Sequence, residues 1–171
     1  AMRFADEEKG DDGFAADLEE KLALAAELKI AGNESYKNEN WSEAIEHYTR
    51  ALDAIKACEA EAEQTDLAAV LLSNRAAARG LADRCMDALS DCERCVELAP
   101  TYMRGVKRRA DCHAALGVWD KSIVDFQAVV DFCAAPASAA ASAGIGDTDG
   151  PAPPAVDEQT AKLLVQAQAG L

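Results

Sequence analysis

Hydrophobic positions between about residues 17 and 133 recur every three or four residues, which is the period of an amphipathic α-helix. One arrangement occurs three times: a small residue, a second small residue 12 positions later, and packing residues 4 and 7 positions after that. The members are Gly32, Ala44, Tyr48 and Ala51; Ala76, Ala88, Cys92 and Cys95; and Ala110, Ser122, Phe126 and Val129. Small residues let two antiparallel helices approach closely, and offsets of 4 and 7 place larger residues on one helical face. The pattern therefore predicts three helix-turn-helix hairpins.

Three breaks in the pattern separate the two helices of each predicted hairpin. They are Asn38-Glu39-Asn40, Ala82-Asp83-Arg84 and Gly117-Val118, and Pro100 ends the second hairpin. The hairpins are expected at about residues 25–56, 66–100 and 101–133. The first two copies are further apart because an acidic stretch, 57–66, is inserted after Ile55.

The remaining segments have a different composition. Residues 1–16 are predicted to be a disordered acidic leader before a helical domain at 17–133. Residues 134–154 are rich in Ala, Ser, Gly and Pro and are predicted to be a flexible linker. Residues 155–171 are predicted to form a short helix that could cap the last hairpin. The predicted fold class is all-α, with three hairpins stacked in a right-handed superhelix.

Composition and charge narrow the function. Only 5% of the 171 residues are aromatic, and 31 acidic against 17 basic residues give a net charge of −14. Such an acidic surface argues against nucleic acid or an anionic membrane as the main partner. No apolar run is long enough to span a membrane, and no signal segment precedes the helices. The six cysteines are therefore expected to be reduced thiols in a cytoplasmic protein.

The repeat resembles the tetratricopeptide repeat (TPR) over roughly residues 25–133. The matching residues are Leu28, Gly32, Tyr36, Ala44, Tyr48 and Ala51; Ala76, Ala88 and Pro100; and Leu116, Trp119, Ile123 and Phe126. Departures are Gly80 inside a helix, and Ser35, Arg79 and His113 at a position that the family often fills with an aromatic residue. The resemblance implies a concave surface, lined by the first helix of each hairpin, that binds a partner.

Five hydrogen-bond donors are expected to line that surface. Lys29 and Asn33 are one helical turn apart, as are Arg104 and Arg108, and Asn74 is equivalent to Arg108 in the repeat. Such a set suits a pair of carboxylates, for example a peptide's C-terminus beside an Asp side chain. A solvated basic face is the alternative, but asparagine is unfavourable inside a helix without a specific role.

The five donors are similar to the dicarboxylate clamp of TPR co-chaperones. Lys29 and Asn33 match the clamp residues of the first unit, and Asn74 matches the asparagine of the second. Arg104 stands where the family has lysine, which keeps the charge but changes the geometry, and Arg108 matches the arginine. The resemblance implies an adaptor that binds the Glu-Glu-Val-Asp tail of the 70-kDa or 90-kDa heat-shock protein. The alternative is a TPR scaffold for another peptide or helix.

The overall likeness is greatest to TPR co-chaperones that carry a J domain. It rests on Asp91-Cys92, Thr101-Tyr102 and the run from Arg108 to Cys112. No His-Pro-Asp tripeptide occurs, so a J domain is not expected in this chain.

Other chemistry receives little support from the sequence. Cys92-x-x-Cys95 lies on a packing face, and no second pair lies at zinc-site spacing, so both cysteines are expected to be buried packing residues. No catalytic Ser-His-Asp or Cys-His arrangement and no phosphate-binding glycine loop occurs. The expectation is a protein that is not an enzyme and holds no metal or cofactor. Trp41 and Trp119 are expected in the core, Arg109 at a structural or rim position, and Arg75 remains open.

Overall fold

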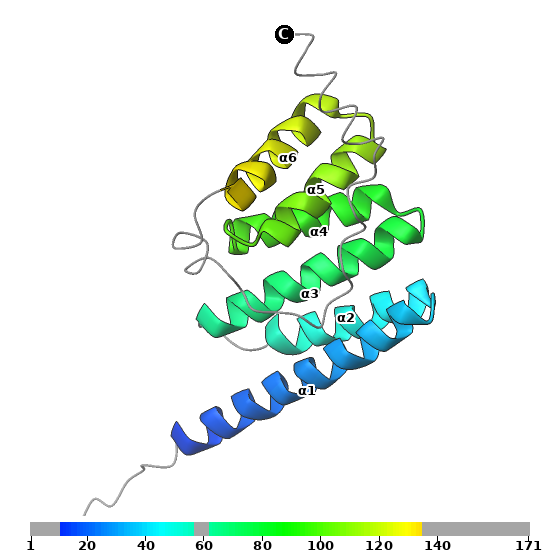
Figure 1. Cartoon of the computed structure of the whole chain (residues 1–171). Coiled ribbons are helices and arrows are strands. Elements are labelled where there is room, and N and C mark those ends of the chain that lie inside the picture. The colour runs from blue at the N-terminus through cyan, green and yellow to red at the C-terminus, as the bar shows by residue number, and fades with distance from the viewer. Residues whose placement is uncertain (1–10, 57–61, 135–171) are drawn as a thin grey trace, which may run out of the picture.

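The computed structural model describes residues 11–56 and 62–134, which form six α-helices (Figure 1). In chain order they are α1 (Asp11–Lys37), α2 (Trp41–Lys56), α3 (Ala62–Leu81), α4 (Cys85–Leu98), α5 (Met103–Ala115) and α6 (Trp119–Ala134). The helices pair as α1/α2, α3/α4 and α5/α6, and α2 packs on α3 and α4 on α5. This arrangement confirms the predicted all-α stack of three hairpins.

Two helices begin at positions that the composition did not indicate. Helix α1 begins at Asp11, inside the stretch predicted as a disordered leader, and its N-terminal part extends beyond the stack in Figure 1. Helix α3 begins at Ala62, so part of the acidic insertion extends this helix. The predicted linker after Ala134 and the predicted C-terminal helix lie outside the described residues.

The three hairpin turns share one backbone geometry at equivalent positions. Glu39, Asp83 and Gly117 have positive φ angles of 62°, 57° and 73°. The next residue in each turn donates its N–H to the carbonyl five residues earlier: Asn40 to Ser35 (2.9 Å), Arg84 to Arg79 (2.8 Å) and Val118 to His113 (2.8 Å). These are the bonds of a left-handed helix C-cap, in which glycine is the usual residue. The same cap therefore ends the first helix of every hairpin.

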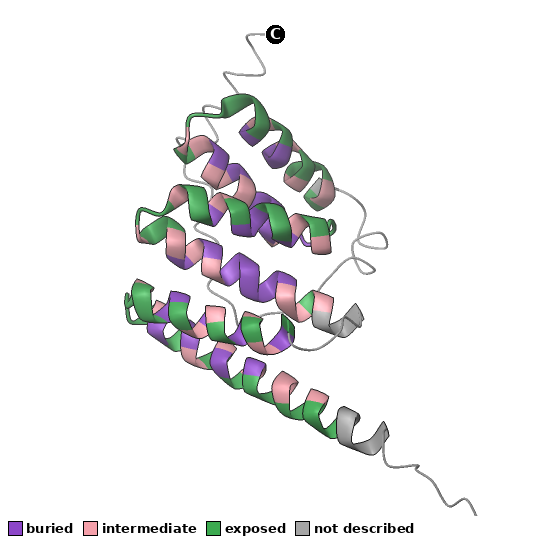
Figure 2. Ribbon diagram, turned by 180° about the vertical axis from the view of Figure 1, so that it is seen from behind, coloured by how far each residue is buried: buried purple, intermediate pink, exposed green. Residues whose placement is uncertain are grey.

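The core forms where the predicted small residues meet larger side chains. Ala44, Ala51, Ala88 and Ala110 have no exposed surface, and neither does Tyr48. Figure 2 shows buried residues gathered along the middle of α3, where residues 69–74 are all buried. Cys92 and Cys95 are also fully buried, as their place on the packing face predicted.

The closest helix approach in the first hairpin depends on Gly32. A Cβ atom at this position would lie 2.6 Å from Cε1 of the Tyr48 ring. We expect Gly32→Ala to destabilise the protein, because overpacking costs about 1–3 kcal/mol. That exceeds the helix propensity of roughly 1 kcal/mol that alanine adds. A urea unfolding curve measures the difference.

Gly80 supplies the matched control for this prediction. No atom lies within 4 Å of the place where its Cβ would be. Gly80→Ala should therefore raise the urea midpoint while Gly32→Ala lowers it. Equal midpoints for the two variants would show that the contact with Tyr48 does not limit the side chain at residue 32.

The two tryptophans differ in burial although they are equivalent in the repeat. Trp41 is half-buried and packs edge-on against Tyr36, with ring centroids 5.0 Å apart. Trp119 is 53% exposed, so the expectation that it lies in the core is wrong. Trp119 begins α6, the last of the described helices, and no described helix covers the outer face of α6.

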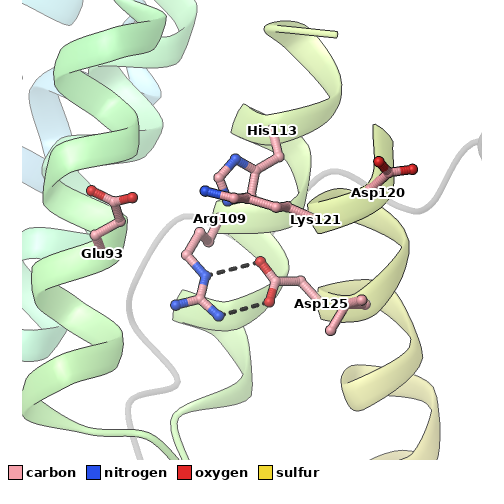
Figure 3. A pocket seen from close by; sticks show the side chains of 7 residues that line it. Glu93, Arg109, His113, Asp120, Lys121 and Asp125 are labelled. Carbon is pink, nitrogen blue, oxygen red and sulfur yellow. Dashed lines mark hydrogen bonds and ion pairs between the residues drawn. The ribbon is translucent and has the colours of Figure 1, made fainter. Parts of the chain in front are cut away.

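Buried ion pairs join the two helices of the second and third hairpins. Arg75 on α3 donates to both carboxylate oxygens of Asp91 on α4, from Nε at 2.9 Å and from Nη2 at 2.7 Å. Arg109 on α5 binds Asp125 on α6 in the same way, at 2.9 and 2.7 Å (Figure 3). The two pairs are 34 residues apart, like the repeats themselves. They give Arg75 and Arg109 a structural role between helices.

Candidate functional site

A chain of hydrogen bonds connects the first helices of the three hairpins. The Asn74 side chain on α3 donates from Nδ2 to Oδ1 of Asn33 on α1, at 3.3 Å. Arg108 on α5 donates from Nη1 to Oδ1 of Asn74 at 3.2 Å and to Oγ of Ser73 at 2.6 Å. Helix α3 contacts both α1 and α5, which brings the three side chains together. Three of the five predicted donors therefore form one network.

Arg108 is the most deeply buried cation of the predicted set. It is 4% exposed, and the hydrogen bonds just described go to neutral oxygens. Burial lowers the pKa of its guanidinium, and the phenols of Tyr102 and Tyr36 oppose that effect. A guanidinium in such surroundings is weakly solvated, so a carboxylate that reaches it would gain more free energy than one bound at the protein surface.

The network fixes the orientation of both asparagine amides. Oδ1 of Asn33 accepts from Asn74 and also from the Tyr48 hydroxyl, which lies 2.7 Å away. The Nδ2 group of Asn33 is therefore turned away from these two partners. Asn33 is 6% exposed and Asn74 is completely buried. The sequence predicted both as direct ligands of a carboxylate, whereas the structure places Asn74 behind its two neighbours as a connecting residue.

Lys29 and Arg104 complete the predicted set at more exposed positions. Lys29 precedes Asn33 by one turn on α1, and Arg104 precedes Arg108 by one turn on α5, and both are half-buried. Nη1 of Arg104 is buried and has no hydrogen-bond partner within the described part of the chain. Two flexible cations thus stand one turn before the fixed network, on its outer two helices.

An apolar cavity of about 340 Å³ lies beside Arg108. Its apolar walls come from the C-terminal half of α3 and from α5, and Tyr36 contributes from α1. The lining residues are Tyr36, Ala76, Ala77, Gly80, Leu81, Cys85, Arg108, Asp111, Cys112 and Ala115. The sequence analysis did not anticipate this cavity, although Gly80, which it singled out as a departure, lines it. The site therefore combines buried donors with an adjoining apolar space.

A second cavity, of about 440 Å³, lies between α4, α5 and α6 (Figure 3). It surrounds the Arg109–Asp125 pair, and Glu93, Asp120 and Lys121 contribute further charges of both signs. The balanced charges and the closed ion pair make this cavity a poor match for a single anionic ligand. It is separate from the network of Asn33, Asn74 and Arg108.

Two kinds of feature are absent among residues 11–56 and 62–134. No group of three or more His, Cys, Asp or Glu side chains is arranged to hold a metal ion. No helix is both long and apolar enough to cross a membrane. The chemistry available at the network is hydrogen bonding and charge attraction.

Comparison with solved structures confirms the tetratricopeptide repeat fold. The second TPR domain of Spaghetti (RPAP3), solved with the HSP90 peptide SRMEEVD, is 27% identical to this chain and has a TM-score of 0.61. The match covers 71% of this chain and 96% of that one. The Sgt2 TPR domain from Aspergillus fumigatus has a TM-score of 0.59 at 22% identity, over 85% of this chain and 82% of that one.

Curated relatives contain the same type of domain within longer proteins. The human mitochondrial import receptor subunit TOM34 is 35% identical over 104 residues, which is 61% of this chain and 33% of that protein. The DnaJ homolog subfamily C member 7 homolog of Schizosaccharomyces pombe is 29% identical over 110 residues, or 64% of this chain and 22% of that protein. The chain thus spans a third or less of these two relatives. No family model matches the chain.

Proposed function

We propose that this TPR domain is a non-enzymatic adaptor that captures an acidic peptide by its free C-terminal carboxylate. The observation that carries the proposal is the network of Asn33, Asn74 and Arg108 across the three inner helices. Lys29 and Arg104 flank it and add two cations within reach of a second carboxylate. The peptide class is the Glu-Glu-Val-Asp tail of the 70-kDa or 90-kDa heat-shock proteins.

Each part of the set has a distinct role in this proposal. Arg108 and Asn33 bind the terminal carboxylate, while Asn74 holds both of them in register. Lys29 adds a further contact to the terminus, and Arg104 binds an acidic side chain of the peptide. Hydrogen bonds to charged groups contribute about 1.5–3 kcal/mol each. Ordering of a flexible tail offsets part of this gain, so an exchangeable complex is expected.

The comparisons support this peptide class through a related domain. The RPAP3 domain, 27% identical, was solved with an HSP90 peptide that ends in Glu-Glu-Val-Asp. The cysteines at 85, 92, 95, 112 and 133 are free thiols, which agrees with the cytoplasmic setting expected for an adaptor of chaperones.

A pair of peptides tests the proposal. We expect a peptide ending in Glu-Glu-Val-Asp to bind as the free acid and its C-terminal amide to bind at least tenfold more weakly, measured by fluorescence anisotropy. Amidation removes the charge that Arg108 would meet and leaves every side chain intact. Equal binding of both peptides, or binding of neither, would overturn the proposal and favour a TPR scaffold for another ligand.

Two lysine variants show whether the peptide lies where we propose. Lys29→Ala should weaken binding of the free acid, because Lys29 stands one turn from Asn33 on the inner helix. Lys56→Ala removes the same charge from the exposed end of α2 and should leave binding unchanged. Equal losses in the two variants would mean that only net charge matters.

A further inference from the structure

Three cysteines gather at the cavity beside Arg108. Cys85, at the start of α4, and Cys112, on α5, both line the cavity of about 340 Å³. Cys92, on α4, is completely buried, and its thiol is hydrogen-bonded to that of Cys112. The described residues hold no metal-type cluster, so this group is not a metal site. Its chemistry is that of thiols.

The contact between the two thiols makes them chemically different. Cys92 has no exposed surface, so ionisation there is unfavourable, and burial together with Cys112 raises the pKa of its thiol. Cys112 is only half-buried and accepts the hydrogen bond of Cys92, which lowers the pKa of the Cys112 thiol. Arg108 lowers it further, while Asp111 opposes the change. Cys112 is therefore the thiol of the pair that ionises.

The other described cysteines lack this combination of activation and access. Cys95 is fully buried and donates to the carbonyl of Ala69 at 3.2 Å, and burial raises the pKa of its thiol to about 12. Cys133 is exposed near the end of α6, away from the cavity. Cys133 thus has better access to solvent, and Cys112 has the better nucleophile.

The position of Cys112 on α5 connects it with the proposed peptide site. Arg104, Arg108 and Cys112 follow one another at intervals of four residues and share one face of the helix. A group attached to the Cys112 sulfur would enter the cavity that begins at Arg108. The volume of that cavity is within the range of small-molecule sites, about 300–1,000 Å³.

We infer that Cys112 is a site of covalent modification by small apolar electrophiles of the α,β-unsaturated carbonyl class, and that the adduct blocks peptide binding. The second half of this inference rests on the proposed function. In the reaction the Cys112 thiolate attacks the β-carbon of the electrophile and a carbon–sulfur bond forms. The π electrons of the double bond shift to the enolate, which takes a proton from water. The thiol proton has already passed to solvent, so this is a net addition in which nothing is oxidised or reduced.

Labelling kinetics test the first half without any peptide. The full chain is treated with N-ethylmaleimide at pH 7, and adduct formation at each cysteine is followed by peptide mapping and mass spectrometry. We expect Cys112 to react at least tenfold faster than Cys133, despite the greater exposure of Cys133. Reaction at Cys112 that is no faster than at Cys133 would overturn the inference.

A Cys92→Ala variant tests the cause of the reactivity. The substitution removes the thiol that donates to Cys112, and the rate at Cys112 should fall toward that at Cys133. Helical circular dichroism confirms that the variant is folded. An unchanged rate in the folded variant would overturn the assignment of Cys92 as the activating group.

Peptide binding then tests the second half. We expect labelled wild-type protein to lose binding of the free-acid peptide, and Cys112→Ser protein exposed to the same reagent to keep it. Retained binding by protein with a complete Cys112 adduct would overturn the blocking role. If untreated protein binds no peptide, the proposed function fails, whereas the labelling rates still decide whether Cys112 is a modification site.

Discussion

Replacing Asp91 by alanine should lower the free energy of unfolding more than any other single change considered for this protein, by about 3–5 kcal/mol. Asp91 is 6% exposed and binds two cations, Arg75 through both of its oxygens and Arg79 at 2.6 Å. Arg75 also donates to the hydroxyl of Thr49 on α2, at 3.1 Å. Removal of one carboxylate leaves two largely buried guanidinium groups unneutralised and loosens the contact between the first and second hairpins. The melting temperature should fall by roughly 10–20 °C.

Asp87 provides the control, because it lies one turn before Asp91 on α4 but pairs with Arg84 in full contact with solvent. Asp87→Ala should leave the urea midpoint almost unchanged. Asp125→Ala should have an intermediate effect, since Asp125 neutralises only Arg109, and Arg109 is more exposed than Arg75. A midpoint for Asp91→Ala equal to that of Asp87→Ala would contradict a stabilising role of the buried pair.

A combined replacement separates lost charge from lost packing. Changing Arg75, Arg79 and Asp91 together to apolar residues of similar volume removes the charges and leaves none unpaired. Such replacements are often neutral or stabilising in other proteins. We therefore expect the triple variant to unfold at a higher urea concentration than Asp91→Ala alone.

The repeat could be predicted from the sequence because it depends on residue size at fixed intervals. Gly32 and Ala44 are small for one reason, the close approach of two helices, and the same reason repeats at the equivalent positions. The shared turn geometry could not be predicted at Glu39 and Asp83, since neither is the glycine usual at positive φ. The start of α1 at Asp11 was also missed, because its acidic sequence has the composition of a disordered segment.

The site was predicted from the types of side chain but not from their burial. Register placed Asn33, Asn74 and Arg108 on adjacent helices, and the structure brings these three together. Register alone could not show that Asn74 has no exposed surface, because burial depends on how closely the hairpins stack. The Arg75–Asp91 pair carried a signal that the sequence analysis overlooked: Arg109 and Asp125 stand 34 residues further along. A cation and an anion that recur together at the repeat interval indicate an ion pair within the repeat.

Replacing Arg108 by alanine should abolish most of the binding of a free-acid peptide, because loss of one partner from a buried charge pair costs about 2–5 kcal/mol. That range corresponds to a loss of affinity of at least thirtyfold. The substitution also removes the donor that Ser73 and Asn74 share, and both residues are fully buried. The variant should therefore melt at a lower temperature, and its binding must be measured well below that temperature, with helical circular dichroism as the check on folding.

The peptide itself separates the binding role of Arg108 from its structural role. If Arg108 meets the terminal carboxylate, amidation should weaken binding to wild-type protein but have little further effect on Arg108→Ala protein, since the interaction is already lost. Arg94→Ala removes the same charge from an exposed site on α4, where Arg94 pairs with Glu97, and should bind the free acid as wild type does. Arg108→Lys keeps the charge without the planar, two-pronged geometry and should bind with intermediate affinity. Equal effects of amidation on wild-type and Arg108→Ala protein would mean that the carboxylate lies elsewhere, and that Arg108 serves only to join α5 to α3.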